Sequence, residues 1–132
     1  MGQQQLLLII LSAVIVGIAI TVGLNMFGQG AYSANRDAVM QDLQIIGARA
    51  QEWYRKPAAL GGGDRSFVDL DSVQQVGFPG ATANGTYTLG TGTATEITVS
   101  GVGREVAPGT DDTVKFDVTV SLDAITNPVI PD

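Results

Sequence analysis

An almost unbroken apolar segment near the start of the chain, Leu6 to Leu24, restricts the fold more than any other feature. A helix of about 20 apolar residues crosses about 30 Å of hydrocarbon, so this segment is long enough to span a bilayer. After Tyr32 the sequence mixes polar and apolar residues throughout. The chain is therefore expected to have two parts, suited to two different solvents.

The flanks of this segment help to identify its type. A removable secretory signal has basic residues before a shorter apolar core, whereas here the first charged side chain is Arg36. A permanent single-span anchor usually carries Lys or Arg on its cytoplasmic flank, and none precedes Leu6. We interpret the missing basic flank as the mark of a processed N-terminus whose basic leader has been removed.

The composition excludes most catalytic designs. The chain has 132 residues, no Cys and no His, so it has no disulfide, no thiolate or imidazole metal ligand and no nucleophile activated by His. We therefore expect no cofactor and no metal, and an enzyme is the least favoured class. The net charge of −6 argues against general nucleic-acid binding.

An amphipathic helix is expected to continue from the apolar segment. From Asn35 onward, apolar residues recur at steps of three and four, which places them on one stripe of a helix: Val39, Leu43, Ile46, Ala50 and Trp53. Arg55 and Lys56 suit a helix C-terminus, and Pro57 prevents continuation. The joined helix would run from about residue 3 to residue 56, roughly 80 Å at about 1.5 Å per residue.

The last third of the chain is typical of β-strands joined by tight turns. In "TVKFDVTVSL", from Thr113 to Leu122, apolar and polar residues alternate strictly, and "GTYTLG" and "TEITVSG" alternate in the same way. These segments predict an antiparallel sheet of three or four strands. Before them, residues 69–77 are expected to form one or two helical turns that begin at Asp69 or Asp71.

The stripe and the inner face of the sheet each need the other in order to be buried. The predicted fold class is therefore α+β: a long N-terminal helix, apolar in its first half, whose amphipathic second half packs on a small antiparallel sheet. Phe116 and Val118 are expected to face the stripe. The expected division is an apolar helix at residues 1–27, an amphipathic half at 28–56, and a loop with the sheet head at 57–132.

A charge-free apolar N-terminus that continues into "RDAVMQDLQIIGARAQEWYRKP" and then a small sheet resembles a bacterial type IV pilin or pseudopilin in its mature form. The resemblance implies a prepilin peptidase, N-methylation of Met1, storage in the inner membrane, and a pilus assembly machinery that builds an extracellular homopolymer. It also implies a set of filament-core residues: Leu6, Leu7, Ile10, Val14, Ile15, Ile18 and Val22.

Four glycines punctuate the end of the apolar segment, and each weakens a helix by about 1 kcal/mol relative to Ala. They are Gly17, Gly23, Gly28 and Gly30. We expect this stretch to lose regular helix in an assembled filament, where neighbouring chains replace lipid. The resemblance to pilins places the break between Gly17 and Gly23.

The chain departs from the family pattern at two points. Pilins usually have a glutamate near the mature N-terminus that is thought to pair with the amine of a neighbouring subunit, and Gln5 stands at that position. An amide accepts a hydrogen bond but does not neutralise an ammonium group, so charge pairing is in doubt for this chain. The paired cysteines of many pilins are also absent.

Some other motifs have simpler interpretations. Asp111 and Asp112 provide too few oxygen ligands for Ca²⁺ and are expected in a solvated turn. Asn84, Gly85 and Thr86 match a glycosylation sequence, but Asn-Gly is also a leading hairpin-turn signal, which we favour.

Two further groups of residues are given structural interpretations. Asp69 and Asp71 are expected at a helix cap or on the surface rather than in catalysis. Four aromatic residues at helical spacing are expected to anchor a core or an interface rather than to conduct electrons: Phe27, Tyr32, Trp53 and Tyr54.

The favoured function is a structural one, the repeating subunit of an extracellular filament. A pseudopilin or minor pilin of a secretion system, and a single-span anchored β binding module, remain alternatives. Adhesion, motility, DNA uptake and secretion are all compatible with such a filament.

Overall fold

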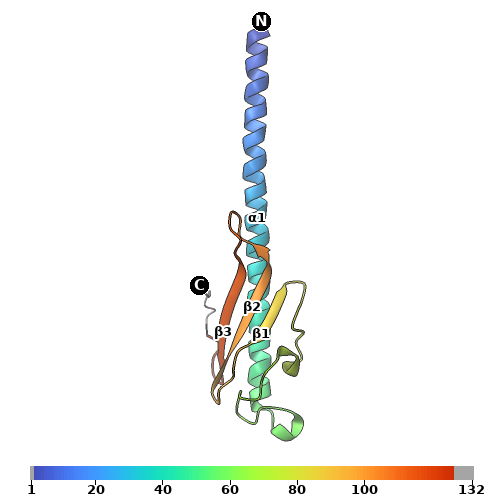
Figure 1. Ribbon diagram of the computed structural model, residues 1–132, viewed down its shortest axis with the longest axis vertical. Helices are drawn as coiled ribbons and strands as arrows, with labels where there is room; N and C mark the ends of the chain where they lie inside the picture. Colours follow the sequence, from blue (N-terminus) through green and yellow to red (C-terminus); the bar gives the residue numbers. More distant parts are fainter. Residues whose placement is uncertain (1, 127–132) are drawn as a thin grey trace.

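One helix dominates the computed structural model, which describes residues 2–126 (Figure 1). Helix α1 (Gly2–Arg55) contains 54 residues and runs without interruption from the apolar segment into the head. At about 1.5 Å per residue it is about 80 Å long. The two halves predicted from the sequence are therefore one continuous rod in the isolated chain.

The C-terminal end of α1 is closed by the loop that follows it. After Pro57 the chain forms the short 3-10 helix η1 (Ala58–Leu60) and then folds back over the last turn. The backbone N–H groups of Gly63 and Arg65 donate to the carbonyls of Trp53 and Tyr54, at 2.9 and 2.8 Å. These bonds satisfy acceptors that a helix end leaves without partners.

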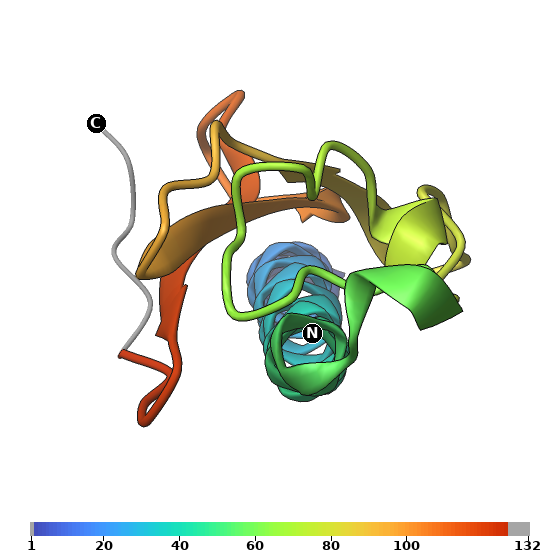
Figure 2. The same ribbon diagram turned by 90° about the horizontal axis from the view of Figure 1, so that it is seen from below.

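Three antiparallel strands form the sheet, in the spatial order β1-β2-β3. They are β1 (Gly85–Leu89), β2 (Glu96–Val106) and β3 (Thr113–Ser121). The prediction allowed three or four strands, and the part of the chain that the structure describes has three. Figure 2 shows the sheet arching over one side of α1.

A single buried cluster joins the helix to the sheet. On β3 the buried and outward positions alternate, so that Phe116 and Val118 are buried while Lys115 is exposed. Arg36 lies over the Phe116 ring, 5.6 Å from its centroid. All seven residues expected in the helix–sheet core lie in this cluster: Val39, Leu43, Ile46, Ala50, Trp53, Phe116 and Val118.

The helix approaches β2 closely because two strand positions lack side chains. A carbon added at Gly101 would lie 3.1 Å from Val39, and one added at Gly103 would overlap Asn35. The side chain of Asn35 uses this space: its Oδ1 accepts the backbone N–H groups of Arg104 and Glu105, at 3.0 and 3.2 Å. These N–H groups lie where the β2–β3 register is irregular, so Asn35 satisfies donors at a bulge.

The expected helical turns at residues 69–77 are present but begin later than predicted. The 3-10 helix η2 (Val73–Val76) starts after Ser72 rather than at Asp69 or Asp71. The side-chain carbonyl of Gln75 accepts the backbone N–H groups of Asp71 and Ser72, at 2.7 and 3.1 Å. The prediction was wrong because Gln75, in a capping-box position, stabilises this start.

Candidate membrane and assembly surface

The apolar half of α1 packs against no other part of the described chain. Its large apolar side chains, from Leu6 to Phe27, are 51–79% exposed. The segment is long and apolar enough to cross a membrane, and none of its most apolar window is buried. All the expected filament-core residues lie on this exposed surface: Leu6, Leu7, Ile10, Val14, Ile15, Ile18 and Val22. Met1 lies outside the described residues.

Two hydroxyl groups inside the apolar segment are satisfied within the helix. Ser12 Oγ donates to the Leu8 carbonyl, and Thr21 Oγ1 donates to the Ile18 carbonyl, both at 2.8 Å. Such bonds remove the need for water, which a hydrocarbon environment does not supply. The segment is therefore compatible with lipid at its polar side chains as well as its apolar ones.

The four glycines in this region have different surroundings. A carbon added at Gly17, Gly23 or Gly30 would meet nothing within 4 Å, whereas one at Gly28 would lie 3.2 Å from Pro108 Cγ. The helix is regular through all four positions in the isolated chain. The expected loss of helix concerns the assembled filament and stays a prediction.

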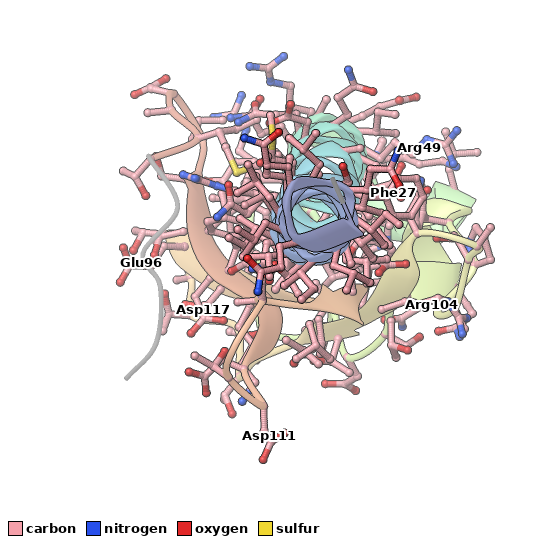
Figure 3. All side chains as sticks on the ribbon, turned by 90° about the horizontal axis from the view of Figure 1, so that it is seen from above. Phe27, Arg49, Glu96, Arg104, Asp111 and Asp117 are labelled. Atoms are coloured by element: carbon pink, nitrogen blue, oxygen red, sulfur yellow. The ribbon has the colours of Figure 1, made fainter. Side chains whose placement is uncertain are left out.

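The contact between Gly28 and Pro108 marks the boundary between the exposed apolar segment and the head. Pro108 belongs to the loop that joins β2 to β3, which reaches along α1 towards its N-terminus (Figure 1). Phe27, one residue earlier, is 79% exposed and projects beside the helix (Figure 3). The exposed apolar segment therefore ends at Phe27, and the contact of α1 with the head begins at the next residue, Gly28.

A polar cluster joins α1 to β1 and to the segment before it. The carboxylate oxygen Oδ2 of Asp42 accepts the Tyr87 hydroxyl at 2.6 Å and the Asn84 side-chain amide at 3.0 Å, and the Thr82 hydroxyl lies 3.5 Å away. Burial of Tyr87 is the larger cause, and its hydrogen bond to Asp42 the smaller one, of a phenol pKa well above its usual range. The hydroxyl therefore stays protonated and continues to donate.

The sequence prediction missed the partners of Asp42, because residues that are more than 40 positions apart meet only through the tertiary fold. Asn84 does lie in a bend between the paired residues Ala81 and Thr86. It is not a left-handed Asn-Gly turn, since neither Asn84 nor Gly85 has a positive φ. The side chain of Asn84 is instead engaged with the helix.

The remaining residues singled out from the sequence are scattered over the head. Asp69, Asp71, Asp111 and Asp112 are exposed, and within residues 2–126 no group of three His, Cys, Asp or Glu side chains is placed to hold a metal ion. Trp53 and Tyr54 lie in the core, and Tyr32 packs against it. These residues form no common site. The main features of the molecule are the exposed apolar half of α1 and a head with its own core.

Comparisons with protein-family models, with characterised proteins and with solved structures find no match to this chain.

Proposed function

We propose that the chain is the structural subunit of an extracellular filament similar to a type IV pilus. The observation that carries this proposal is the exposed apolar half of a helix whose other half forms part of the core of a folded head. The apolar half binds copies of itself in the filament, and the heads face solvent.

An apolar surface of this size requires another environment than water. Monomeric soluble proteins rarely expose a contiguous apolar patch above a few hundred Å², and here every large apolar side chain over some twenty residues is more than half exposed. Lipid satisfies the segment before assembly, and neighbouring copies replace the lipid afterwards. The transfer leaves no backbone group unpaired, because a helix satisfies its hydrogen bonds internally.

The continuity of α1 favours a filament over a simple tether. A tethered binding module needs only a flexible connection to its anchor, whereas here the buried stripe of the head follows on the same helix. In the isolated chain the continuous rod fixes the head at a defined height and angle on the apolar segment, and the loss of helix expected on assembly is confined to residues 17–30. Defined geometry between the two parts is what a repeating assembly requires.

The proposed life history follows the pilin pattern. The chain resides in the inner membrane, a prepilin peptidase processes it and methylates Met1, and the assembly machinery extracts it into the filament. Each of these partners is a proposal, and specific recognition of nucleic acid is not part of it.

Negative-stain microscopy of sheared cell surfaces, with an antibody to the head, tests this function. Long filaments labelled along their whole length are expected. Labelling only at tips or on short filaments would indicate a minor pilin or pseudopilin. A chain that stays in the membrane fraction, with no labelled filament, would contradict the proposal and favour the anchored binding module.

A further inference from the structure

A pocket with two guanidinium groups lies at the end of the head that is farthest from the apolar segment. It has a volume of about 400 Å³ and is lined by Tyr54, Arg55, Arg65 and Leu122. Among residues 2–126 the lining includes no carboxylate, and both arginines are exposed. The pocket therefore offers an apolar wall and two positive charges to an acidic group.

The backbone holds one of these arginines in an unusual conformation. Asp64 and Arg65 are consecutive non-glycine residues in the left-handed region, with φ of 48° and 64°. Their N–H groups are fixed to the carbonyls of Lys56 and Tyr54, at 3.0 and 2.8 Å. Such a conformation persists only where the surroundings enforce it, so the position of Arg65 beside Arg55 is built into the loop.

The opposite end of the head carries a protruding acidic tip, which we define as residues 107–112 of the β2–β3 loop. Asp111 and Asp112 are exposed there, and Asp111 projects far from the helix axis (Figure 3). The loop is ordered by bonds between Ala107 and Asp112 and between Thr110 and Ala107, at 2.9 and 3.1 Å. The tip is a defined shape with two negative charges.

The pocket and the acidic tip are too far apart to meet within one chain. Pro108 of the tip contacts Gly28, whereas the pocket includes Arg55, so about 27 residues of α1 separate the two levels. At about 1.5 Å per residue the separation is about 40 Å. Any contact between them has to join two copies.

We propose that the acidic tip of one copy docks in the arginine pocket of a second copy displaced by about one head length along α1. This proposal rests on the filament function. The two parts of α1 have nearly equal lengths, residues 2–27 and 28–55, so the displacement places the apolar half of one copy beside the head-bearing half of the next. Heads then cover apolar segments while their charged ends meet.

The symmetry of such a contact favours a polymer. Tip and pocket are different surfaces, so the contact is heterologous, and a heterologous contact that does not close into a ring produces an open helical assembly. Each added copy presents a new tip and a new pocket.

The absence of cysteine allows a direct test by cross-linking. The full chain with Asp111→Cys and Arg65→Cys is expressed, and surface filaments are oxidised and separated on a non-reducing gel. A ladder of covalent multimers is expected, since a disulfide requires Cα atoms within about 7 Å and the two positions do not approach within one chain. The single variants, and Asp111→Cys with Thr88→Cys on β1, are the controls and are expected to give no ladder.

Charge reversal supplies a second readout. Arg65→Glu is expected to lower filament yield about tenfold. Asp111→Arg in the same chain is expected to restore most of it, because residue 111 then pairs with residue 65 while Asp112 still faces Arg55. Lys115→Glu, the same charge change on the sheet, is the matched control. Filaments that form normally without a ladder, and without sensitivity to Arg65→Glu, would overturn this contact and leave the filament function standing. Absence of filaments from the unmodified chain would overturn both.

Discussion

The two halves of α1 have the same backbone structure and opposite surroundings. Between Leu6 and Phe27 every large apolar side chain is exposed, whereas between Val39 and Tyr54 one stripe is buried against the sheet and the other faces are mostly polar or exposed. Hydrogen bonding within the helix does not distinguish them. The difference is that the sheet of the same chain packs against the second half, whereas no described part of the chain packs against the first half.

The comparison shows that one helix can have two sources of stability. The second half is stabilised by side chains that the same chain provides, so it is complete in an isolated subunit. The first half is complete as a helix but not as a packed structure, and it depends on lipid or on neighbouring copies. A substitution should therefore affect assembly in the first half and folding in the second.

The largest expected effect comes from placing a charge in the first half. Ile15→Asp puts a carboxylate near the middle of the apolar segment, which costs about 2.5–3.5 kcal/mol in membrane insertion and more in a packed core. We expect loss of filaments, measured by microscopy, together with loss from the membrane fraction.

The control is Gln44→Asp, an added charge on an exposed position of the second half. It should leave filaments and membrane residence unchanged. Limited proteolysis should show an intact head in both variants. Normal filaments from Ile15→Asp would mean that residue 15 is not in the assembled core.

The next effect tests the second half. Phe116→Ala removes a buried ring from the core and is expected to lower the free energy of unfolding by about 3–5 kcal/mol. The neighbouring Lys115→Ala, on the outer face of β3, should change it by less than about 0.5 kcal/mol. Thermal unfolding in mild detergent measures both, and equal tolerance of the two changes would contradict the strand register.

A smaller effect concerns the polar cluster on the second half. Tyr87→Phe removes a hydrogen bond to the Asp42 carboxylate and should cost about 1.5–3 kcal/mol of unfolding free energy. Tyr32→Phe is the matched control, because Tyr32 is a partly buried tyrosine on α1 outside this cluster. A cost for Tyr87→Phe no greater than for the control would show that the hydrogen bond adds little.

The same tyrosine predicts an alkaline limit to stability. Its pKa is raised in the folded chain, so above about pH 10 the unfolded chain loses the phenol proton first and gains stability relative to the folded one. Below that pH the contribution is fully present. Unfolding measured between pH 8 and about pH 11 should show a decline that Tyr87→Phe reduces. An unchanged decline in the variant would assign it to other groups.

The smallest effect is expected at the glycines of the first half. Gly17→Ala with Gly23→Ala adds about 1 kcal/mol of helix preference at each site, and both alanines fit because nothing lies within 4 Å. The structure of the isolated chain should be unchanged, because α1 is already helical at both positions. Filaments of the variant should extend less under force. A filament map with regular helical bonding from Gly17 through Gly30 would contradict the expected melting.

The features predicted well from the sequence are those set by periodicity. The amphipathic half of α1 followed from a repeat of three and four, and the inward face of β3 followed from strict alternation. Together these two patterns predicted the α+β class. Pro57 and the apolar segment mark boundaries that depend only on neighbouring residues. Local rules suffice for such elements.

The features that were missed depend on residues distant in the sequence. Asn35 satisfies donors at a bulge 69 and 70 positions away, and Asp42 accepts bonds from partners 42 and 45 positions away. No periodic signal marks these pairs. The left-handed pair Asp64 and Arg65 was missed for a related reason, because its conformation is set by carbonyls of the helix end on which the loop folds.

The uninterrupted course of α1 also has a mechanical consequence. A rod without a joint transmits torque as well as tension, so turning the head by some angle turns the apolar half by the same angle. When the apolar half is held and the head is pushed sideways, the head acts as a lever arm. The bending moment on α1 is then greatest near Gly28, where the contact with the β2–β3 loop ends. Gly23 and Gly30 lie on either side of that point and each lower the helix preference by about 1 kcal/mol relative to Ala, so we expect the helix to give way there first under such a load.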